Sequence, residues 1–429
     1  MLARWLYTLL LYLLTVPMLA RLGIRGLRNR DYWLRWRERL GFVPAMPIQG
    51  ALWLHAVSVG EVNALARLIE LLLRRDPNRP LIVTTGTPTG SARARQLFGG
   101  RVHHAYLPFD LPGAVRRFLS RIDPCLGVIA ETEIWPNLYT QAAHRQIPLL
   151  IVNARLSERS MRGFAIMPGV RLIRSALEGV VAVLAQSETD AERYRRLGAR
   201  PDRVRPVGNL KFDLVVEPEV RITGGNVRAA MGAHRPVWIA ASTHEGEEQI
   251  VLDAHARVLQ SLPEALLLVA PRHSERFRGM TQAARVAGLR VRTRSLDLLP
   301  ANDTQCFVLD SLGELMGFYA SADVAFVGGS LAPIGGHNVL EPAALGVPVL
   351  VGPNTFNSVE IVDALITAGA ASRVEDADSL ASSVLNLLHD EPARIRMGTA
   401  GLNVVERGRG ALQEIAAAIE QQLAAVRRT

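Results

Sequence analysis

Acidic residues follow two apolar segments in the N-terminal half of the chain and are candidates for proton transfer. Glu61 closes SVGE (58–61), just after the apolar run LWLHAV, and Gly60 permits a tight turn before it. A partly buried carboxylate here could act as a general base, because burial moves its pKa towards neutrality. The alternative interpretation is that Glu61 only complements the dipole of a helix that starts here.

Two further motifs of this half carry charges that could assist a reaction. Glu131 and Glu133 lie in ETEIWPN (131–137), where like charges near a cleft would raise each other's pKa. Lys211, in GNLKFD (208–213), is the only lysine of the chain, and its compact charge suits a phosphate or an anionic transition state. Helix capping for the carboxylates and chance retention for the lysine remain the alternatives.

The C-terminal half carries groups that suit a phosphorylated ligand. In GGSLAPIGGHNVLEPAALGVPVLVGP (328–353), glycines precede Asn338, which caps a predicted helix with Glu341 in its first turn. Glycines let backbone amides approach a phosphate, and a glutamate one turn into the helix can hold ribose hydroxyls. Arg272, in APRH (270–273), can bind a phosphate or carboxylate through two N–H groups, unless it is an ordinary surface charge.

Two other motifs give weaker signals. GTPTG (86–90) suits an anion site at a helix start, but it lacks the GK[ST] of a nucleotide-binding P-loop. STHEGEE (242–248) brings His244, Glu245 and Glu247 together, without the paired histidines of a zinc protease helix. We therefore favour an anion contact by the serine and threonine that open this motif over a metal site.

The elements that must position these motifs are short apolar runs that alternate with helical stretches. The runs lie at 52–57, 80–85, 102–108, 125–131, 148–154, 180–186 and 204–209, and again at 236–242, 266–271, 290–294, 305–310, 323–329 and 348–352. Runs that are apolar throughout predict strands buried on both faces, and their alternation with helices predicts parallel sheets. The fold class is therefore α/β, with two doubly wound, Rossmann-like domains. Ligands of such sheets bind at the carboxyl ends of the strands, and we expect the active site in the cleft between the domains.

The same pattern predicts the domain boundaries. We expect a membrane anchor helix at 1–22, an N-terminal domain at 23–212 and a C-terminal domain with a helical tail at 227–429. Residues 213–226 contain one proline and a glycine pair and show no clean periodicity, which is typical of a linker.

The N-terminus carries a signal for membrane association. Residues 5–20 contain no charge, but sixteen residues are fewer than the roughly 20 that a spanning helix needs. Spanning the membrane, lying in its interface and packing inside the protein all remain open. Seven arginines between Arg21 and Arg39, with Trp33 and Trp36 among them, favour attachment with the large C-terminal part on the cytoplasmic side.

Composition limits the classes of partner. The chain has 49 Lys and Arg against 40 Asp and Glu, a net charge of +9 that favours anionic partners. No nucleic-acid-binding signature is present, so we expect no nucleic acid partner. The two cysteines lie in separate apolar runs, which excludes a disulfide scaffold and a structural zinc site and suits a reducing compartment.

Taken in order, these motifs resemble those of the 3-deoxy-D-manno-octulosonic acid (Kdo) transferases of Gram-negative bacteria. The resemblance covers nearly the whole chain, including the N-terminal helix, and implies a GT-B glycosyltransferase with two Rossmann-like domains facing a cleft. It implies an inverting transfer of Kdo from CMP-Kdo to the lipid A precursor, lipid IVA, in lipopolysaccharide biosynthesis. The reaction would occur at the cytoplasmic side of the inner membrane, without a cofactor or bound metal.

The resemblance also implies roles for individual residues. Glu61 would be the general base, assisted by Glu131 and Lys211. CMP would be bound by Pro271 and Arg272, by Gly313, Glu314 and Leu315 of the DSLGEL segment, and by Asn338, Val339, Leu340 and Glu341. Two other interpretations are a different GT-B enzyme, such as a sugar-nucleotide epimerase or a lipid A disaccharide synthase type, and a non-catalytic membrane scaffold that keeps the nucleotide-binding fold.

Overall fold

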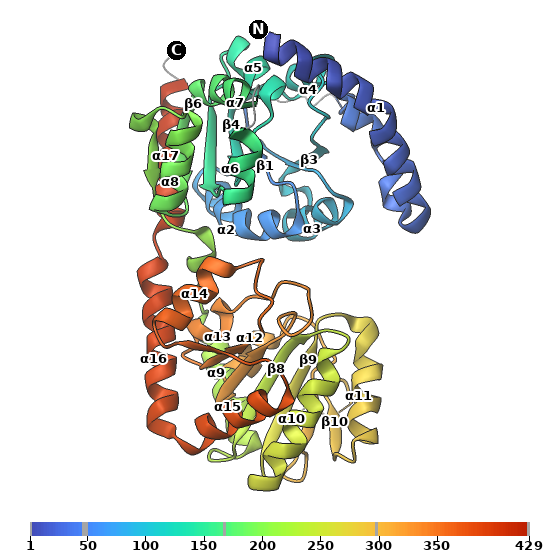
Figure 1. Ribbon diagram of the computed structural model, residues 1–429, viewed down its shortest axis with the longest axis vertical. Helices are drawn as coiled ribbons and strands as arrows, with labels where there is room; N and C mark the ends of the chain where they lie inside the picture. The colour runs from blue at the N-terminus through green and yellow to red at the C-terminus, as the bar shows by residue number, and fades with distance from the viewer. Residues whose placement is uncertain (1, 45–49, 166–168, 297–298, 427–429) are drawn as a thin grey trace. The chain divides into compact units, whose positions relative to one another are not determined.

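The computed structural model describes residues 2–44, 50–165, 169–296 and 299–426. Met1, where the expected anchor helix begins, and residues 427–429, where the expected C-terminal domain ends, lie outside the described residues. The chain divides into two units, each built on its own sheet (Figure 1). The first unit is Met1–Asp213 with Arg409–Thr429, and the second is Leu214–Gly408. The predicted α/β class is confirmed.

The first unit contains a parallel sheet of seven strands in the order β3-β2-β1-β4-β5-β6-β7. The strands are β1 (Ala51–His55), β2 (Leu81–Thr85), β3 (His103–Tyr106), β4 (Pro124–Ala130), β5 (Leu149–Ala154), β6 (Val180–Ala185) and β7 (Val204–Pro206). They lie within the seven apolar runs that the sequence predicts, except that β1 and β4 each begin one residue earlier. The strands β1, β2 and β5 are buried throughout, as strands covered by helices on both faces should be.

Helices cover both faces of this sheet. They are α2 (Val59–Arg75), α3 (Pro88–Phe98), α4 (Pro112–Ile122), α5 (Pro136–His144), α6 (Glu158–Ala165), α7 (Gly169–Glu178), α8 (Glu188–Leu197) and α17 (Ala411–Val426). One core cluster joins the sheet to α4, α5, α7 and α8, and a second cluster joins its other face to α2, α3 and α17.

The second unit repeats this plan with the strand order β10-β11-β9-β8-β12-β13-β14. Its strands are β8 (Val237–Thr243), β9 (Leu266–Pro271), β10 (Val291–Thr293), β11 (Cys306–Val308), β12 (Val324–Val327), β13 (Val349–Val351) and β14 (Ala371–Arg373). Its helices are α9 (Pro218–Met231), α10 (Glu247–Ser261), α11 (Phe277–Val286), α12 (Leu315–Tyr319), α13 (Leu340–Ala344), α14 (Val359–Thr367), α15 (Ala377–His389) and α16 (Glu391–Gly408). The edge strand β14 is not among the predicted runs, because two of its three residues are exposed.

The expected linker at 213–226 is mostly the helix α9. Val220, Gly224, Val227 and Met231 recur at helical spacing and pack towards the core of the second unit. Gly224 lies so close to α12 that an added Cβ would come 2.4 Å from the Cβ of Ala320. The glycine that we interpreted as a sign of a linker is therefore required for close helix packing.

The expected helical tail of the C-terminal domain also differs from the structure. α17 belongs to the first unit, where Ile415, Ile419 and Leu423 join the core cluster on the face of α2 (Figure 1). The carboxylate of Asp213, the last residue before the second unit, accepts hydrogen bonds from the backbone N–H groups of Gly410 and Leu412 at 2.8 Å each. The chain thus enters and leaves the second unit at two neighbouring points.

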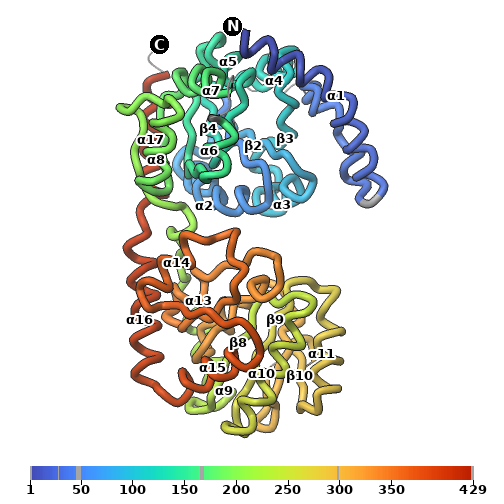
Figure 2. Tube along the Cα trace, in the orientation of Figure 1, coloured from blue at the N-terminus to red at the C-terminus, as the bar shows by residue number. Residues whose placement is uncertain are grey.

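The N-terminal helix α1 (Leu2–Arg28) runs along the outside of the first unit (Figure 2) and continues beyond the expected end at residue 22. Over Leu2–Leu27 it is long and apolar enough to cross a membrane, by length and composition alone. Tyr7 donates a hydrogen bond to Asp110 at 3.0 Å, and Thr8 bonds Asn137, while many apolar side chains of α1 are exposed. The helix α1 therefore makes polar contacts with the first unit and also exposes apolar side chains.

Deleting residues 2–20 should move much of the protein from the membrane fraction to the soluble fraction. The apolar core residues described for the first unit come from the sheet and the later helices, so the unit should keep its fold. Sedimentation of membranes followed by quantification of the protein, with a melting curve of the soluble form, checks both expectations. Complete retention in the membrane fraction would show that the basic segment ending at Arg39 is sufficient for attachment.

Candidate active site

Glu61 lies in the first turn of α2, immediately beyond the carboxyl end of β1. Its carboxylate accepts hydrogen bonds from the backbone N–H of Val57 at 2.7 Å and from the hydroxyl of Ser58 at 3.0 Å. Ser58 in turn caps α2. Burial nevertheless raises the pKa of Glu61 to about 7, helped by the charges of Glu131 and Glu133 and opposed by these two hydrogen bonds.

This geometry joins the two interpretations of SVGE. Glu61 does contribute to the helix start, because it closes a reciprocal contact with the capping serine. The partial burial of Glu61 also brings its pKa into the range where a general base works at neutral pH. GTPTG, by comparison, serves as a cap: the hydroxyl of Thr87 accepts from the N–H of Gly90 at 3.1 Å at the start of α3.

Glu131 follows β4, the strand beside β1, so the two carboxylates flank the point where the strand order reverses. Binding sites of open parallel sheets form at this point. Glu131 has a φ of 54°, a left-handed conformation that few residues other than glycine adopt. Burial raises the pKa of Glu131, and the positive charges of Lys211 and Arg155 oppose that shift.

Buried tyrosines hold the backbone at both carboxylates of ETEIWPN. The hydroxyl of Tyr194 donates to the carbonyl of Glu131 at 2.8 Å, and that of Tyr139 donates to the carbonyl of Glu133 at 2.9 Å. Both rings are almost fully buried. The positions of the two acidic residues are therefore fixed from the core of the unit.

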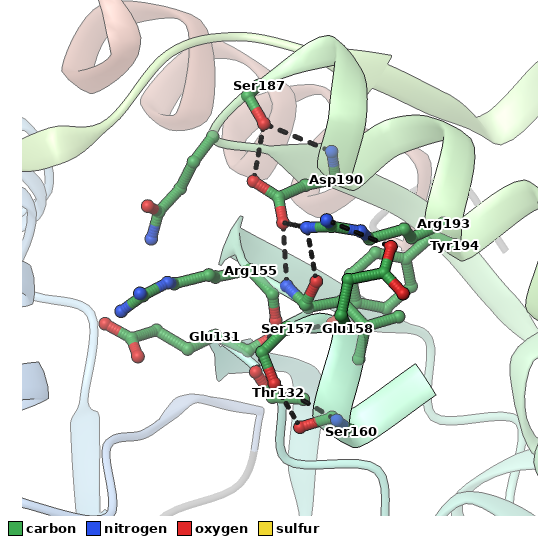
Figure 3. Close-up of polar contacts among 12 residues, drawn as sticks. Glu131, Thr132, Arg155, Ser157, Glu158, Ser160, Ser187, Asp190, Arg193 and Tyr194 are labelled. Atoms are coloured by element: carbon green, nitrogen blue, oxygen red, sulfur yellow. Dashed lines mark hydrogen bonds and ion pairs between the residues drawn. The ribbon is translucent and has the colours of Figure 1, made fainter. Parts of the chain in front are cut away.

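Arg155, which our sequence analysis missed, extends beside the carboxylate of Glu131 (Figure 3). It follows β5, the next strand in the sheet. The hydroxyl of Thr132 donates to the carbonyl of Arg155, and the neighbouring Leu156 is held from α8, where Asp190 accepts from its N–H and Arg193 donates to its carbonyl, both at 2.8 Å. The arginine is thus anchored through its backbone, with its guanidinium beside a carboxylate.

Lys211 lies in the short helical turn Leu210–Phe212, near Glu131. Asn153, a buried polar residue in β5 with a φ of 50°, accepts a hydrogen bond from the N–H of Leu210 at 3.0 Å. Gln186 donates to the carbonyl of Asn153 and accepts from the side chain of Asn209. This amide network fixes the loop that carries the lysine, and the asparagine inside an apolar run was the signal that could have revealed it.

In the second unit, the glycine-rich loop is organised by one buried carboxylate. Glu247, at the start of α10, accepts hydrogen bonds from four consecutive backbone N–H groups, those of Gly329 to Ala332, at 2.7–3.2 Å. It also accepts from the N–H of His244 at 2.9 Å. Glu247 therefore holds a loop, and no group of three or more His, Cys, Asp or Glu suited to a metal ion occurs among the described residues.

The structure places Arg272 close to the end of this loop. Arg272 follows β9, and its positive charge opposes the rise in the pKa of Glu341 that burial causes. Asn338 donates to the carboxylate of Glu341 at 3.0 Å and also accepts from the N–H of Leu340 at 3.2 Å. Pro271, Val339 and Leu340, which the resemblance also implied for the nucleotide site, are buried.

The third predicted nucleotide-binding segment follows β11, on the other side of β9. Gly313 has a φ of 93°, and Leu315 begins α12. The carboxylate of Glu314 is bound by Arg294 at 2.6 Å and by Ser311, and these hydrogen bonds lower its pKa. An ion pair already occupies the side chain of Glu314, which leaves the backbone of this turn as the part available to a ligand.

Replacing Tyr194 by Phe should lower turnover more than replacing Tyr139 by Phe. Each change removes one buried hydroxyl and leaves one carbonyl unpaired, so each should cost about 1 kcal/mol of unfolding free energy. Only the first releases the backbone of Glu131, and a small misplacement at a reacting centre lowers turnover by roughly tenfold or more. Turnover and denaturant unfolding of both variants check this; a larger turnover loss in Tyr139→Phe would make Glu133 the important carboxylate.

Comparisons with known protein families and with known relatives match most of the chain to glycosyltransferases. The family described as 3-deoxy-D-manno-octulosonic-acid transferase (kdotransferase) matches residues 34–214, and that described as glycosyl transferases group 1 matches residues 247–404. The chain is 39% identical to the 3-deoxy-D-manno-octulosonic acid transferase of Haemophilus influenzae, with 96% of this chain and 97% of that protein covered. It is 36% identical to the corresponding protein of Bordetella pertussis, over 94% of this chain and 98% of that one.

Solved structures with the same fold have distant sequences. A putative UDP-N-acetylglucosamine 2-epimerase from Listeria monocytogenes has a TM-score of 0.54 at 15% identity, with 88% of this chain and 98% of that one covered. The glycotransferase of kitacinnamycin has a TM-score of 0.53 at 14% identity, with 88% of this chain and 100% of that one covered. These similarities concern the fold alone and agree with the expected GT-B class. With sequence identity across nearly their full lengths to two named relatives, the chain belongs to the Kdo transferase family of glycosyltransferases.

Proposed function

We propose that the protein transfers Kdo from CMP-Kdo to the lipid A precursor, lipid IVA, with inversion at the sugar carbon. The observation that carries this proposal is Glu61: a partly buried carboxylate with a pKa of about 7 beside Glu131, in a chain of the Kdo transferase family. Inversion needs a single base on the side of the sugar opposite the leaving group, and Glu61 has the pKa that this role requires.

In the proposed step, an acceptor hydroxyl attacks the anomeric carbon of Kdo. Its oxygen forms the new glycosidic bond while its proton passes to Glu61, and the bond from the carbon to the CMP phosphate breaks with its electron pair. CMP leaves as an anion. Lys211 and Arg155 supply positive charge beside Glu131, where negative charge on the reacting groups would otherwise be costly.

The second unit would hold the donor. Arg272 offers a two-pronged guanidinium to an anionic group of the donor, and Glu341 would accept hydrogen bonds from ribose hydroxyls. The turn at Gly313 would contact the nucleotide through its backbone. The proximity of Arg272 to Glu341 supports this assignment, because one ligand could contact both side chains.

The acceptor is a phosphorylated lipid, and the first unit carries features that suit it. The exposed apolar side chains of α1 and the arginines that follow it would bind an anionic membrane surface. The exposed rings of Trp33 and Trp36 suit the level of the lipid headgroups. We propose that the enzyme works at the cytoplasmic side of the bacterial inner membrane.

Incubating the purified full-length protein with CMP-Kdo and lipid IVA should release CMP and give a lipid product that carries Kdo. Mass spectrometry of the lipid and chromatography of the nucleotide follow both products. CMP released equally without the lipid would indicate hydrolysis of the donor, and a nucleotide sugar that is converted without CMP release would indicate an epimerase.

Replacing Glu61 by Gln should lower turnover by about 10²–10⁴-fold and leave CMP affinity close to that of the unmodified protein, because Gln cannot accept the proton. In the unmodified protein, turnover should rise with pH to a plateau, with a midpoint near 7, because the base must be ionised. Rate measurements between pH 5.5 and 9, together with CMP titration, check both. A Gln variant that keeps most of its activity would exclude Glu61 as the base.

Ser58→Ala provides the matched control. It removes a hydrogen bond that lowers the pKa of Glu61 while leaving the carboxylate in place. The midpoint of the pH profile should therefore move upwards, and turnover on the plateau should change little. Because the pKa of Glu61 is raised by folding, its contribution to stability is present below its unfolded pKa and is lost as the pH rises through about 7. The Gln variant should lack this loss.

A further inference from the structure

Three histidines gather at the carboxyl ends of neighbouring strands of the second unit, next to Arg272. His244 follows β8, His273 follows β9, and His337 lies in the loop after β12. The rings of His244 and His337 are parallel, with centroids 5.0 Å apart and an angle of 4° between their planes, and they meet through their Nε2 atoms, which are 2.7 Å apart. His273 meets the ring of His244 edge-on, at 5.3 Å and 79°.

Two imidazole nitrogens at 2.7 Å require a proton between them. One Nε2 donates and the other accepts, so in the neutral pair one ring carries its proton on Nε2 and the other on Nδ1. The donating ring is left with a free lone pair on Nδ1. Within the described part of the chain, neither Nδ1 has a hydrogen-bond partner.

The charges around the pair oppose a second proton in the free protein. Burial lowers the pKa of His337 to about 4, helped by His244, Arg272 and His273, and burial also lowers the pKa of His244. Glu247 and Glu248 favour the charged form of His244. Glu247 accepts hydrogen bonds from five backbone N–H groups, and Glu248 is paired with Arg276, so neither carboxylate cancels the effect of burial on the pKa of His244. The pair is therefore neutral at pH 7 until another negative charge arrives.

We propose that the His244–His337 pair takes up one proton from solvent when an anionic group binds beside Arg272. The proton adds to the free Nδ1 of the ring that donates through Nε2, and the pair then carries one positive charge with an N–H on every nitrogen except one. The empty donor site thus carries one permanent cation, Arg272. The occupied site carries two cations, Arg272 and the protonated histidine pair. This inference rests on the proposed function only in taking the anion to be part of the donor, as a phosphate or a sugar carboxylate.

The proposal couples affinity to pH in one direction. An anion beside the pair favours its protonated form, so the pKa of the pair is higher in the complex than in the free protein. Between these two pKa values binding consumes protons, and affinity falls as the pH rises, by at most about tenfold per pH unit for one proton.

Calorimetric titration of the full-length protein with CMP tests this directly. Titrations at pH 7.5 in two buffers that differ in ionisation enthalpy give the number of protons taken up on binding. His337→Gln and His244→Gln should each reduce that number, whereas His234→Gln, at an exposed histidine outside the cluster, should leave it unchanged. The phosphate of CMP also titrates, but with a second pKa of about 6 it is almost fully ionised at pH 7.5 before binding, and a cationic site keeps it ionised, so it takes up few protons in any variant. Melting curves show whether each variant is folded.

The outcomes separate this inference from the proposed function. CMP binding with equal proton uptake in the unmodified protein and both pair variants would overturn the proton-sharing pair and leave the donor assignment intact. Absence of CMP binding by the unmodified protein would overturn both. Repeating the titration with free Kdo, which has a carboxylate but no phosphate, identifies the anion: excess uptake with CMP indicates the phosphate, and excess uptake with Kdo alone indicates the carboxylate.

Discussion

Parallel strand pairing is the constraint on which both candidate sites depend. Every pair of neighbouring strands in the two sheets is parallel, so each strand must be followed by a crossover and the loops after the strands gather at one edge. In the first sheet this edge brings together the loops that carry Glu61, Glu131, Arg155 and Lys211, although 150 positions separate the first from the last. In the second sheet, β8 and β12 lie side by side where the strand order reverses, and their loops supply the paired histidines.

Burial shifts the pKa values of the side chains at these two sheet edges in opposite directions. It raises the pKa values of the glutamates in the first unit, so that a carboxylate changes charge near neutral pH. It lowers the pKa values of the histidines in the second unit, which stay neutral next to an arginine. Both effects disfavour the charged form of a buried group, and in both units backbone hydrogen bonds hold the affected side chains in place.

The sequence was most informative where the local pattern decides the structure. Uninterrupted apolar runs identified the buried strands. The motifs also placed Glu61, Arg272 and Glu341 after strands, which is where the structure has them, and their roles stay predictions. It was least informative where distant contacts decide. Tyr194 and Gln186 show no local sign of their roles, because these depend on backbone groups more than 30 positions away. α9 and α17 were misassigned for the same reason: a glycine that permits close packing resembles one in a linker, and an amphipathic helix does not specify which core it covers.

The return of α17 makes the second unit an uninterrupted insertion within the first. During synthesis on the ribosome, residues 214–408 emerge complete before the helix that finishes the other core. The second unit can therefore fold while the first unit still exposes the apolar surface of β4 and β5 that α17 covers. Assembly of the first unit then waits for the last turns of the chain, which makes its nascent form the aggregation-prone stage in the life of this protein.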